Sequence, residues 1–321
     1  MIWATLAILI GLPVLVWSAE RFIHGAAFTA GYFGTSPLFI GMFIIGFGTS
    51  APEIIVSIFS SLQGNGGLAL GNVYGSNIAN ITLIVGMTAL LSPIAVKSNI
   101  VRKELPILLM VSLLSIWQLI DLELSHDDAY SLLGILLILI GWSAWQAVRE
   151  PEDKLAEDIA ETVQPDKASL NVHLMWLVAG LVILIISSRV LVWGAVEVAQ
   201  YFGVSEVIIG LTIVGIGTSL PELISSIIAV RKNEHELAIG NVVGSNLFNL
   251  LAVAGIAGVI SPIQLDQSFL YRDGALMLAA TVALMIFCLG FRGPGKVTRL
   301  EGAIFLCCFI AYNYYLITTQ F

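Results

Sequence analysis

The stretch GIGTSLPELISS, residues Gly215–Ser226, places a proline and a glutamate inside a long apolar run. The stretch GFGTSAPEIIVS, Gly46–Ser57, repeats this arrangement 169 residues earlier. Proline has no N–H for the carbonyl four residues before it, and its ring crowds that carbonyl. We therefore expect each helix to open at the glycine four residues before the proline, Gly48 and Gly217, directly ahead of the carboxylates.

The composition is that of an integral membrane protein. Of the 321 residues, 58% are hydrophobic and 11% are charged, and the mean hydropathy is +0.94. These values lie far from those of soluble domains. The net charge of −8 carries little information about partners, because seven of the 22 acidic residues fall in a single polar stretch. The lipid bilayer is the expected surrounding, and we expect no nucleic-acid partner.

Ten apolar stretches are long enough for helices to cross the hydrocarbon core. They cover residues 2–29, 36–62, 67–91, 105–121, 130–147, 172–199, 205–230, 237–260, 274–290 and 301–319. The one long polar segment, 149–171, separates the fifth stretch from the sixth. We predict a first unit of residues 1–148, an acidic cytoplasmic linker of residues 149–171, and a second unit of residues 172–321.

The two units are copies of one another, and the offset of 169 residues continues without a gap beyond the Pro-Glu motif. The matched pairs include Gly25/Gly194, Gly34/Gly203, Pro52/Pro221, Glu53/Glu222, Gly71/Gly240, Ser76/Ser245 and Asn80/Asn249. Five spans is an odd number, so the second copy enters the membrane from the opposite side. The predicted fold is an all-α membrane protein of ten transmembrane helices in two inverted five-helix repeats, an architecture typical of transporters.

The basic residues predict the orientation of the chain, because Lys and Arg in short loops favour the cytoplasmic side. Only Arg189 and Arg272 fall on one side of the predicted topology. The other side carries Arg21, Lys97, Arg102, Lys103, Arg149, Lys154, Lys167, Arg231, Lys232, Arg292, Lys296 and Arg299. We expect a multi-pass protein of the inner (plasma) membrane with the linker in the cytoplasm and both termini outside.

A second duplicated motif follows the first, as GNVYGSNIAN from Gly71 and GNVVGSNLFN from Gly240. Asn72, Ser76 and Asn80 are spaced four residues apart and form a polar stripe on one helical face. The second copy repeats the stripe with Asn241, Ser245 and Asn249. A single stripe of this kind could serve as hydrogen-bonding contact between helices. Its duplication together with the Pro-Glu break favours a binding site.

The side chains in the two motifs offer only oxygen ligands. They are the carboxylates of Glu53 and Glu222, the hydroxyls of Thr49, Ser50, Thr218, Ser219, Ser76 and Ser245, and the amides of Asn80 and Asn249. Such a set favours calcium or sodium over zinc, copper or iron. An intramembrane carboxylate needs compensation, and no Lys or Arg lies in these segments, so we expect a cation or a proton as its partner.

The pattern GTSxPE followed by GNxxGSNxxN, once in each half, resembles the two alpha-repeats of the sodium/calcium exchanger family. The resemblance implies a transporter without a cofactor whose substrates are calcium and sodium, with Glu53 and Glu222 shared between the two ions. It implies further ligands in Thr49, Ser50, Ser76, Thr218, Ser219, Ser245 and the carbonyls of Gly46 and Gly215. It also implies alternating access, in which the first and sixth helices slide across the rest.

One residue departs from the pattern of some members of that family. Those members carry an aspartate at the position of Asn249, whereas both copies carry asparagine here. The site therefore has one titratable group fewer, which leaves the sodium stoichiometry and the sensitivity to protons open.

Other functions fit the motifs less well. Proton coupling remains the alternative to sodium, although no acid follows Gly71-Asn72 or Gly240-Asn241 within four residues, as it does in proton-coupled relatives. Paired intramembrane carboxylates also occur in aspartyl proteases, but those use Asp and a GxGD motif, which this chain lacks. A passive channel would be expected to line its pore with rings of residues around an axis, not with inverted copies.

The predicted topology can be tested with reporters that are active on one side of the membrane only. A reporter inserted near Glu157 should be cytoplasmic, and one fused after Phe321 should be external, because twelve of the 14 basic residues lie on the side of the linker. The reverse pattern would contradict the predicted orientation, and the same side for both positions would contradict the inverted-repeat interpretation.

Overall fold

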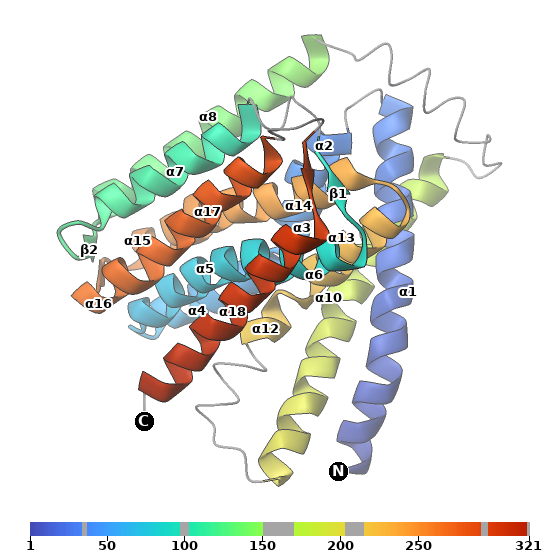
Figure 1. Cartoon of the computed structure of the whole chain (residues 1–321), viewed down its shortest axis with the longest axis horizontal. Coiled ribbons are helices and arrows are strands. Elements are labelled where there is room, and N and C mark those ends of the chain that lie inside the picture. The colour runs from blue at the N-terminus through green and yellow to red at the C-terminus, as the bar shows by residue number, and fades with distance from the viewer. Residues whose placement is uncertain (34–36, 97–102, 150–169, 203–214, 290–294, 320–321) are drawn as a thin grey trace.

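A computed structural model describes residues 1–33, 37–96, 103–149, 170–202, 215–289 and 295–319. Almost all of the described residues are helical (Figure 1). By length and composition, the described residues include five helices able to cross a membrane, or six when one bent pair is counted as a single span. Helices occupy all ten predicted stretches, although residues 205–214 of the seventh stretch lie outside the described residues.

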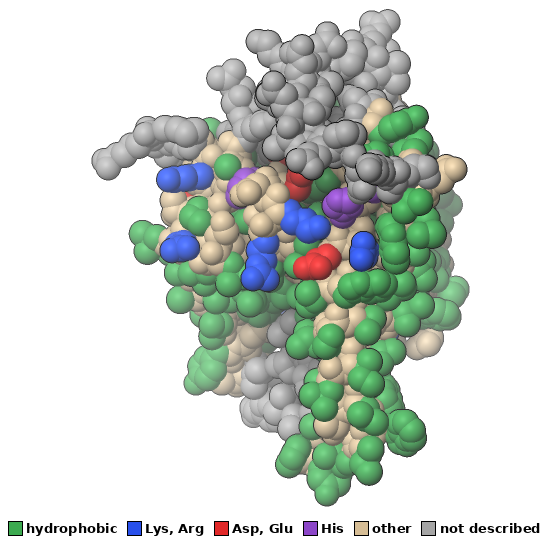
Figure 2. All heavy atoms as spheres, turned by 90° about the vertical axis from the view of Figure 1, so that its right-hand side faces the viewer, with side chains coloured by type: hydrophobic (Ala, Val, Ile, Leu, Met, Phe, Trp, Pro, Cys, Tyr) green, Lys and Arg blue, Asp and Glu red, His purple; other side chains and the backbone are tan. Residues whose placement is uncertain are grey.

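Two long helices, α1 (Ile2–Phe33) and α10 (Leu170–Tyr201), lie side by side along one edge of the molecule (Figure 1). Only 28% of the residues in the most apolar window of each helix are buried. Figure 2 shows this edge, with apolar side chains over most of it and charged and histidine side chains gathered in a band towards one end. The Arg21 guanidinium lies 5.9 Å from the centre of the Trp17 ring and 5.1 Å from that of Trp176. Tryptophan and arginine in this arrangement are typical of a membrane interface.

The centre of the molecule is formed by two helices that are related by the repeat. The first consists of α5 (Gly66–Ala79), η2 (Asn80–Val85) and α6 (Gly86–Leu91). The second consists of α14 (His235–Phe248), η5 (Asn249–Val253) and α15 (Ala254–Ile260). In both, 83% of the most apolar window is buried. The segments η2 and η5 are π-helical turns, which are frequently found at functional sites.

The Pro-Glu motifs interrupt their helices, as the sequence predicts. The first helix comprises α2 (Pro37–Ile40), η1 (Gly41–Gly46), α3 (Phe47–Thr49) and α4 (Ala51–Leu62), and it bends by 49° between α3 and α4. In the second repeat, α12 (Gly215–Thr218) is followed by α13 (Leu220–Arg231).

The expected position of the opening, at Gly48 and Gly217, is wrong by two residues. The helices are interrupted at Ser50 and Ser219, which have backbone angles (φ, ψ) of −78°, 4° and −89°, 6°. Each proline lies in the first turn of the following helix. The N–H groups in the first turn of a helix have no acceptor within that helix, so the missing N–H of proline costs nothing there. The proline therefore favours the start of a new helix, and the bend falls on the residue before that helix, Ser50 or Ser219.

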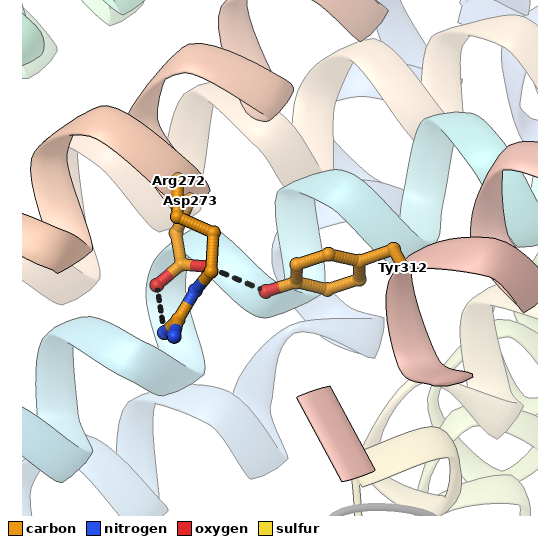
Figure 3. Close-up of polar contacts among 3 residues, drawn as sticks. All are labelled: Arg272, Asp273 and Tyr312. Atoms are coloured by element: carbon orange, nitrogen blue, oxygen red, sulfur yellow. Dashed lines mark hydrogen bonds and ion pairs between the residues drawn. The ribbon is translucent and has the colours of Figure 1, made fainter. Parts of the chain in front are cut away.

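The remaining helices cover the other edge of the core: α7 (Leu105–Gln118), α8 (His126–Arg149), α16 (Gln267–Phe269), η6 (Leu270–Gly274), α17 (Ala275–Cys288) and α18 (Arg299–Thr319). The buried Asp273 carboxylate accepts hydrogen bonds from Arg272 Nε and from the Tyr312 hydroxyl, each 2.8 Å long (Figure 3). The bond from Tyr312 connects η6 to α18. The charges of Arg272 and Asp273 compensate one another.

Two short antiparallel ribbons, which the sequence does not predict, connect the halves. The strand β1 (Ile94–Ala95) pairs with β4 (Lys296–Val297), and β2 (Glu123–Leu124) pairs with β3 (Ile263–Gln264). Each ribbon joins a segment of the first repeat to a segment of the second.

Glycines allow the interrupted helix of the first repeat to pack closely on α14 of the second. A Cβ atom added at Gly41 would lie 2.9 Å from the Leu237 carbonyl oxygen, and one at Gly46 would lie 2.9 Å from the Ser245 backbone nitrogen. A Cβ atom at Gly244 would overlap the Met42 carbonyl. Backbone therefore lies against backbone where the two repeats meet, as expected for small residues at helix contacts in membranes.

This packing predicts that Gly244→Ala lowers stability, because the Met42 carbonyl is backbone and cannot move aside without shifting η1. Overpacking of this kind costs about 1–3 kcal/mol. We expect a lower midpoint of thermal unfolding and less monodisperse protein in detergent. Gly141→Ala on the exposed part of α8 is the control, because its Cβ atom would meet nothing within 4 Å. Equal midpoints for the two variants would show that the close approach is unimportant.

Candidate cation-binding site

Two glutamates occupy the core, one from each repeat. Glu53 lies in the first turn of α4 and Glu222 in the first turn of α13, and each is 1% exposed. The amide groups at the start of a helix favour a negative charge at this position. The two carboxylates are close enough to repel one another, and neither forms an ion pair with a described residue.

Hydroxyls of the GTS motifs reach across to the other repeat. The Ser50 hydroxyl donates to Glu222 Oε1 over 3.4 Å, and the Thr49 hydroxyl, whose nearest acceptor is the Ile45 carbonyl at 3.0 Å, also lies 3.2 Å from Asn241 Oδ1. In the opposite direction, the Thr218 hydroxyl lies within hydrogen-bonding reach of Glu53. Each carboxylate is therefore within reach of a hydroxyl from the half that does not carry it.

Four asparagine side chains form a second connection between the repeats. The amide of Asn80 donates to Asn246 Oδ1 over 2.9 Å, and the amide of Asn249 donates to Asn77 Oδ1 over 3.1 Å. Asn80 and Asn249 are also the first residues of the π-helical turns η2 and η5. Because their N–H groups are held by the partner repeat, their carbonyl oxygens remain available.

Asn77 and Asn246 were not among the predicted site residues, although both lie in the duplicated GSN triplet. They fall outside the stripe of residues spaced by four, so helical spacing alone assigns them to another face. Their exact duplication in the two motifs was the signal that could have identified them.

Asn72 and Asn241 hold the glutamate-bearing helices. The Asn72 amide donates to the backbone carbonyl of Glu53 over 3.1 Å and to Ser57 Oγ over 3.0 Å. The Asn241 amide makes the same pair of bonds, to the carbonyl of Glu222 over 3.1 Å and to Ser226 Oγ over 2.9 Å. These bonds hold the backbone of Glu53 and of Glu222, and they thereby fix where each carboxylate lies.

Five buried oxygens in this region have no hydrogen-bond partner among the described residues. They are Glu53 Oε2, Glu222 Oε2, Asn80 Oδ1, Asn249 Oδ1 and Ser219 Oγ. Leaving such groups unpaired is costly, and most buried polar groups in proteins are satisfied. Carboxylate, amide and hydroxyl oxygens are the ligands that hard cations prefer, so these oxygens are chemically suited to bind one.

The remaining predicted ligands are the hydroxyls of Ser76 and Ser245 and the carbonyls of Gly46 and Gly215. Ser76 and Ser245 are both buried, and the Ser245 hydroxyl donates to the Gly46 carbonyl over 3.3 Å. That carbonyl also accepts the Ser50 backbone N–H over 3.1 Å, so in this conformation it is held by protein donors. Gly215 is the first residue of α12, and its burial lies outside what the structure describes.

Comparisons with known proteins identify the family of this chain. The family model described as "Sodium/calcium exchanger protein" matches residues 3–145 and 172–318. The chain belongs to the sodium/calcium exchanger family. It is 43% identical to CaxA of Alkalimonas amylolytica over 99% of this chain and 100% of that protein. It is 40% identical to the inner membrane protein YrbG of Escherichia coli K12 over 90% of this chain and 89% of the relative.

The fold agrees with a solved member of the family. The sodium-calcium exchanger NCX_Mj superimposes with a TM-score of 0.84 and 27% sequence identity, covering 98% of this chain and 99% of that one. The agreement supports ten membrane-spanning helices in two inverted repeats. As a member of this exchanger family, the chain is a multi-pass membrane antiporter, and the family is one of transporters, not of enzymes.

Proposed function

We propose that this protein exchanges calcium for sodium across the inner membrane by alternating access. The observation that supports the proposal most directly is the pair of buried carboxylates, Glu53 and Glu222, with the unpartnered oxygens around them. Two ionised carboxylates balance the charge of one calcium ion, and net charge in a low-dielectric core is costly. Among the relatives, NCX_Mj has been solved after soaking with sodium and calcium, and YrbG is named an inner membrane protein.

The proposed ligands are those of the duplicated motifs: Glu53, Glu222, Thr49, Ser50, Thr218, Ser219, Ser76, Ser245, Asn80, Asn249 and the carbonyls of Gly46 and Gly215. Glu53 and Glu222 would be shared by calcium and sodium. Binding would require the hydroxyls of Ser50 and Ser245 to turn away from their present acceptors, Glu222 and Gly46. Rotation of a serine hydroxyl needs little rearrangement, so the same oxygens can serve either ion.

The arrangement of α1 and α10 supports an opening towards one side. Helix α1 packs along α13, whereas α10 makes no comparable contact with α4 among the described residues. The end of α13 at Arg231 is cytoplasmic in the predicted topology. The contact of α1 with α13 would then close the cytoplasmic path and leave the outer path, beside α4, as the side from which ions enter.

Proton exchange is the second candidate, because two neighbouring carboxylates could accept protons in place of sodium. The dipoles of hydroxyls and amides favour sodium. Ser50, Ser219, Asn80 and Asn249 supply neutral oxygens at the site, which a proton does not need but a sodium ion requires as ligands. Calcium uptake into proteoliposomes, with sodium, potassium or proton gradients imposed one at a time, separates the two candidates.

Neutralising either carboxylate should nearly abolish calcium transport. Glu53→Gln or Glu222→Gln leaves one negative charge to balance a divalent ion, while the glutamine keeps the shape of the side chain. The measurement is radioactive calcium uptake into sodium-loaded proteoliposomes at equal protein content. Glu157→Gln in the acidic linker is the control and should transport normally. Uptake near the unmutated rate in either site variant would show that the central site is misassigned.

Sodium should compete with calcium from the same side of the membrane. Two carboxylates balance one calcium ion, whereas more than two sodium ions leave a positive charge that hydroxyl and amide dipoles must stabilise. Calcium flux should therefore fall as sodium on that side is raised. Asn249→Asp adds a titratable group, so it should change the dependence of flux on sodium and pH more than the calcium affinity. The proposal is falsified if sodium has no effect on calcium flux at pH 6, 7 and 8 while an imposed proton gradient drives it.

A further inference from the structure

The contact between α1 and α10 obeys the symmetry of the repeat. A Cβ atom at Gly25 would lie 2.7 Å from the His173 carbonyl oxygen, and one at the equivalent Gly194 would lie 2.7 Å from the Ala4 carbonyl oxygen. His173 and Ala4 are themselves separated by the offset of 169 residues. The two helices therefore form an internally symmetric antiparallel pair, and most of each faces away from the core.

The attachment of this pair to the core is not symmetric. Helix α1 packs along α13, and Lys232 Nζ donates to the Glu20 carbonyl over 3.4 Å. Helix α10 makes no comparable contact with α4 among the described residues. In inverted-repeat transporters, each half can adopt the conformation of the other. In the exchanged state α10 would pack along α4 and α1 would leave α13, so the same site would open to the opposite side.

One hydrogen bond on the α10 side has no possible counterpart on the α1 side. The buried Ser188 hydroxyl donates to the Gly217 carbonyl over 3.2 Å. In an uninterrupted helix this carbonyl would accept the N–H of the residue four positions later. That residue is Pro221, which has no N–H. The residue equivalent to Ser188 in α1 is Ala19, which has no hydroxyl for the carbonyl of Gly48. The neighbouring serines remain symmetric, because Ser18 donates to the Leu15 carbonyl and Ser187 to that of Leu184.

We propose that Ser188 is a positioning residue that holds the α1–α10 pair in the present state and so sets how the population divides between the two open states. The inference rests on the proposed alternating access. In the present state, the acceptor freed by Pro221 is satisfied from α10. In the exchanged state, Ala19 would face the Gly48 carbonyl and could not donate, so the exchanged state lacks this bond.

The symmetry supplies a matched set of variants. Ser188→Ala removes the bond from the present state, and Ala19→Ser adds one to the exchanged state, so both should shift the population away from the present state. The double variant Ala19→Ser/Ser188→Ala should shift it furthest. Ser187→Ala removes a hydroxyl that bonds only within its own helix and is the control. A buried neutral hydrogen bond predicts a change of about two- to tenfold in the population ratio for each single variant.

The population is measured by hydrogen–deuterium exchange of α4 and α13 in the purified full-length protein, without transported ions. Ser188→Ala should increase deuterium uptake in α13 and decrease it in α4, and Ser188→Thr, which keeps the hydroxyl, should restore the original pattern. In flux assays, Ser188→Ala should change the apparent affinities for calcium on the two sides in opposite directions.

Unchanged exchange in Ser188→Ala, or the same change in Ser187→Ala, would overturn the assignment of Ser188. This outcome is distinct from failure of the proposed calcium–sodium exchange, because the exchange measurement requires neither ion. A uniform rise in deuterium uptake over the whole chain would also overturn it, since it would indicate general destabilisation and not a shift between two states.

Discussion

Two carboxylates that share an apolar core without a basic partner impose the main constraint on this structure. Removing an ionised carboxylate from water costs several kcal/mol even after relaxation, and two that repel one another cost more. The structure offsets part of this cost by starting a helix at each glutamate and by directing hydroxyls of the opposite repeat to it. The described residues leave the rest uncompensated, which supports the proposed binding of a cation.

This arrangement requires both repeats. The bonds from Ser50 to Glu222, from Asn80 to Asn246 and from Asn249 to Asn77 all cross between the halves. They can form only because the backbones approach closely at glycines such as Gly244. Neither half presents the ligand set by itself.

The sequence was sufficient to predict the ten helices, their inverted repetition and the interruption at each Pro-Glu pair, because all of these depend on apolar length, chain offset and proline chemistry. It placed the opening at Gly48 where the structure has it at Ser50, because proline begins the next helix instead of ending the previous one. Asn77 was missed because helical spacing predicts which residues share a face but not which side chains meet between two helices. The two-residue strands were missed because they are too short to show any periodicity.

An inverted repeat of identical halves would have two exchanged conformations of equal free energy, apart from any difference between the surroundings on the two sides. Any built-in preference must therefore reside at positions where the halves differ. Among the positions of the α1–α10 pair that differ between the halves, Ala19 corresponds to Ser188. The difference concerns a hydrogen bond beside the interrupted helix. The Ser188 hydroxyl can therefore bias the resting conformation, as proposed above.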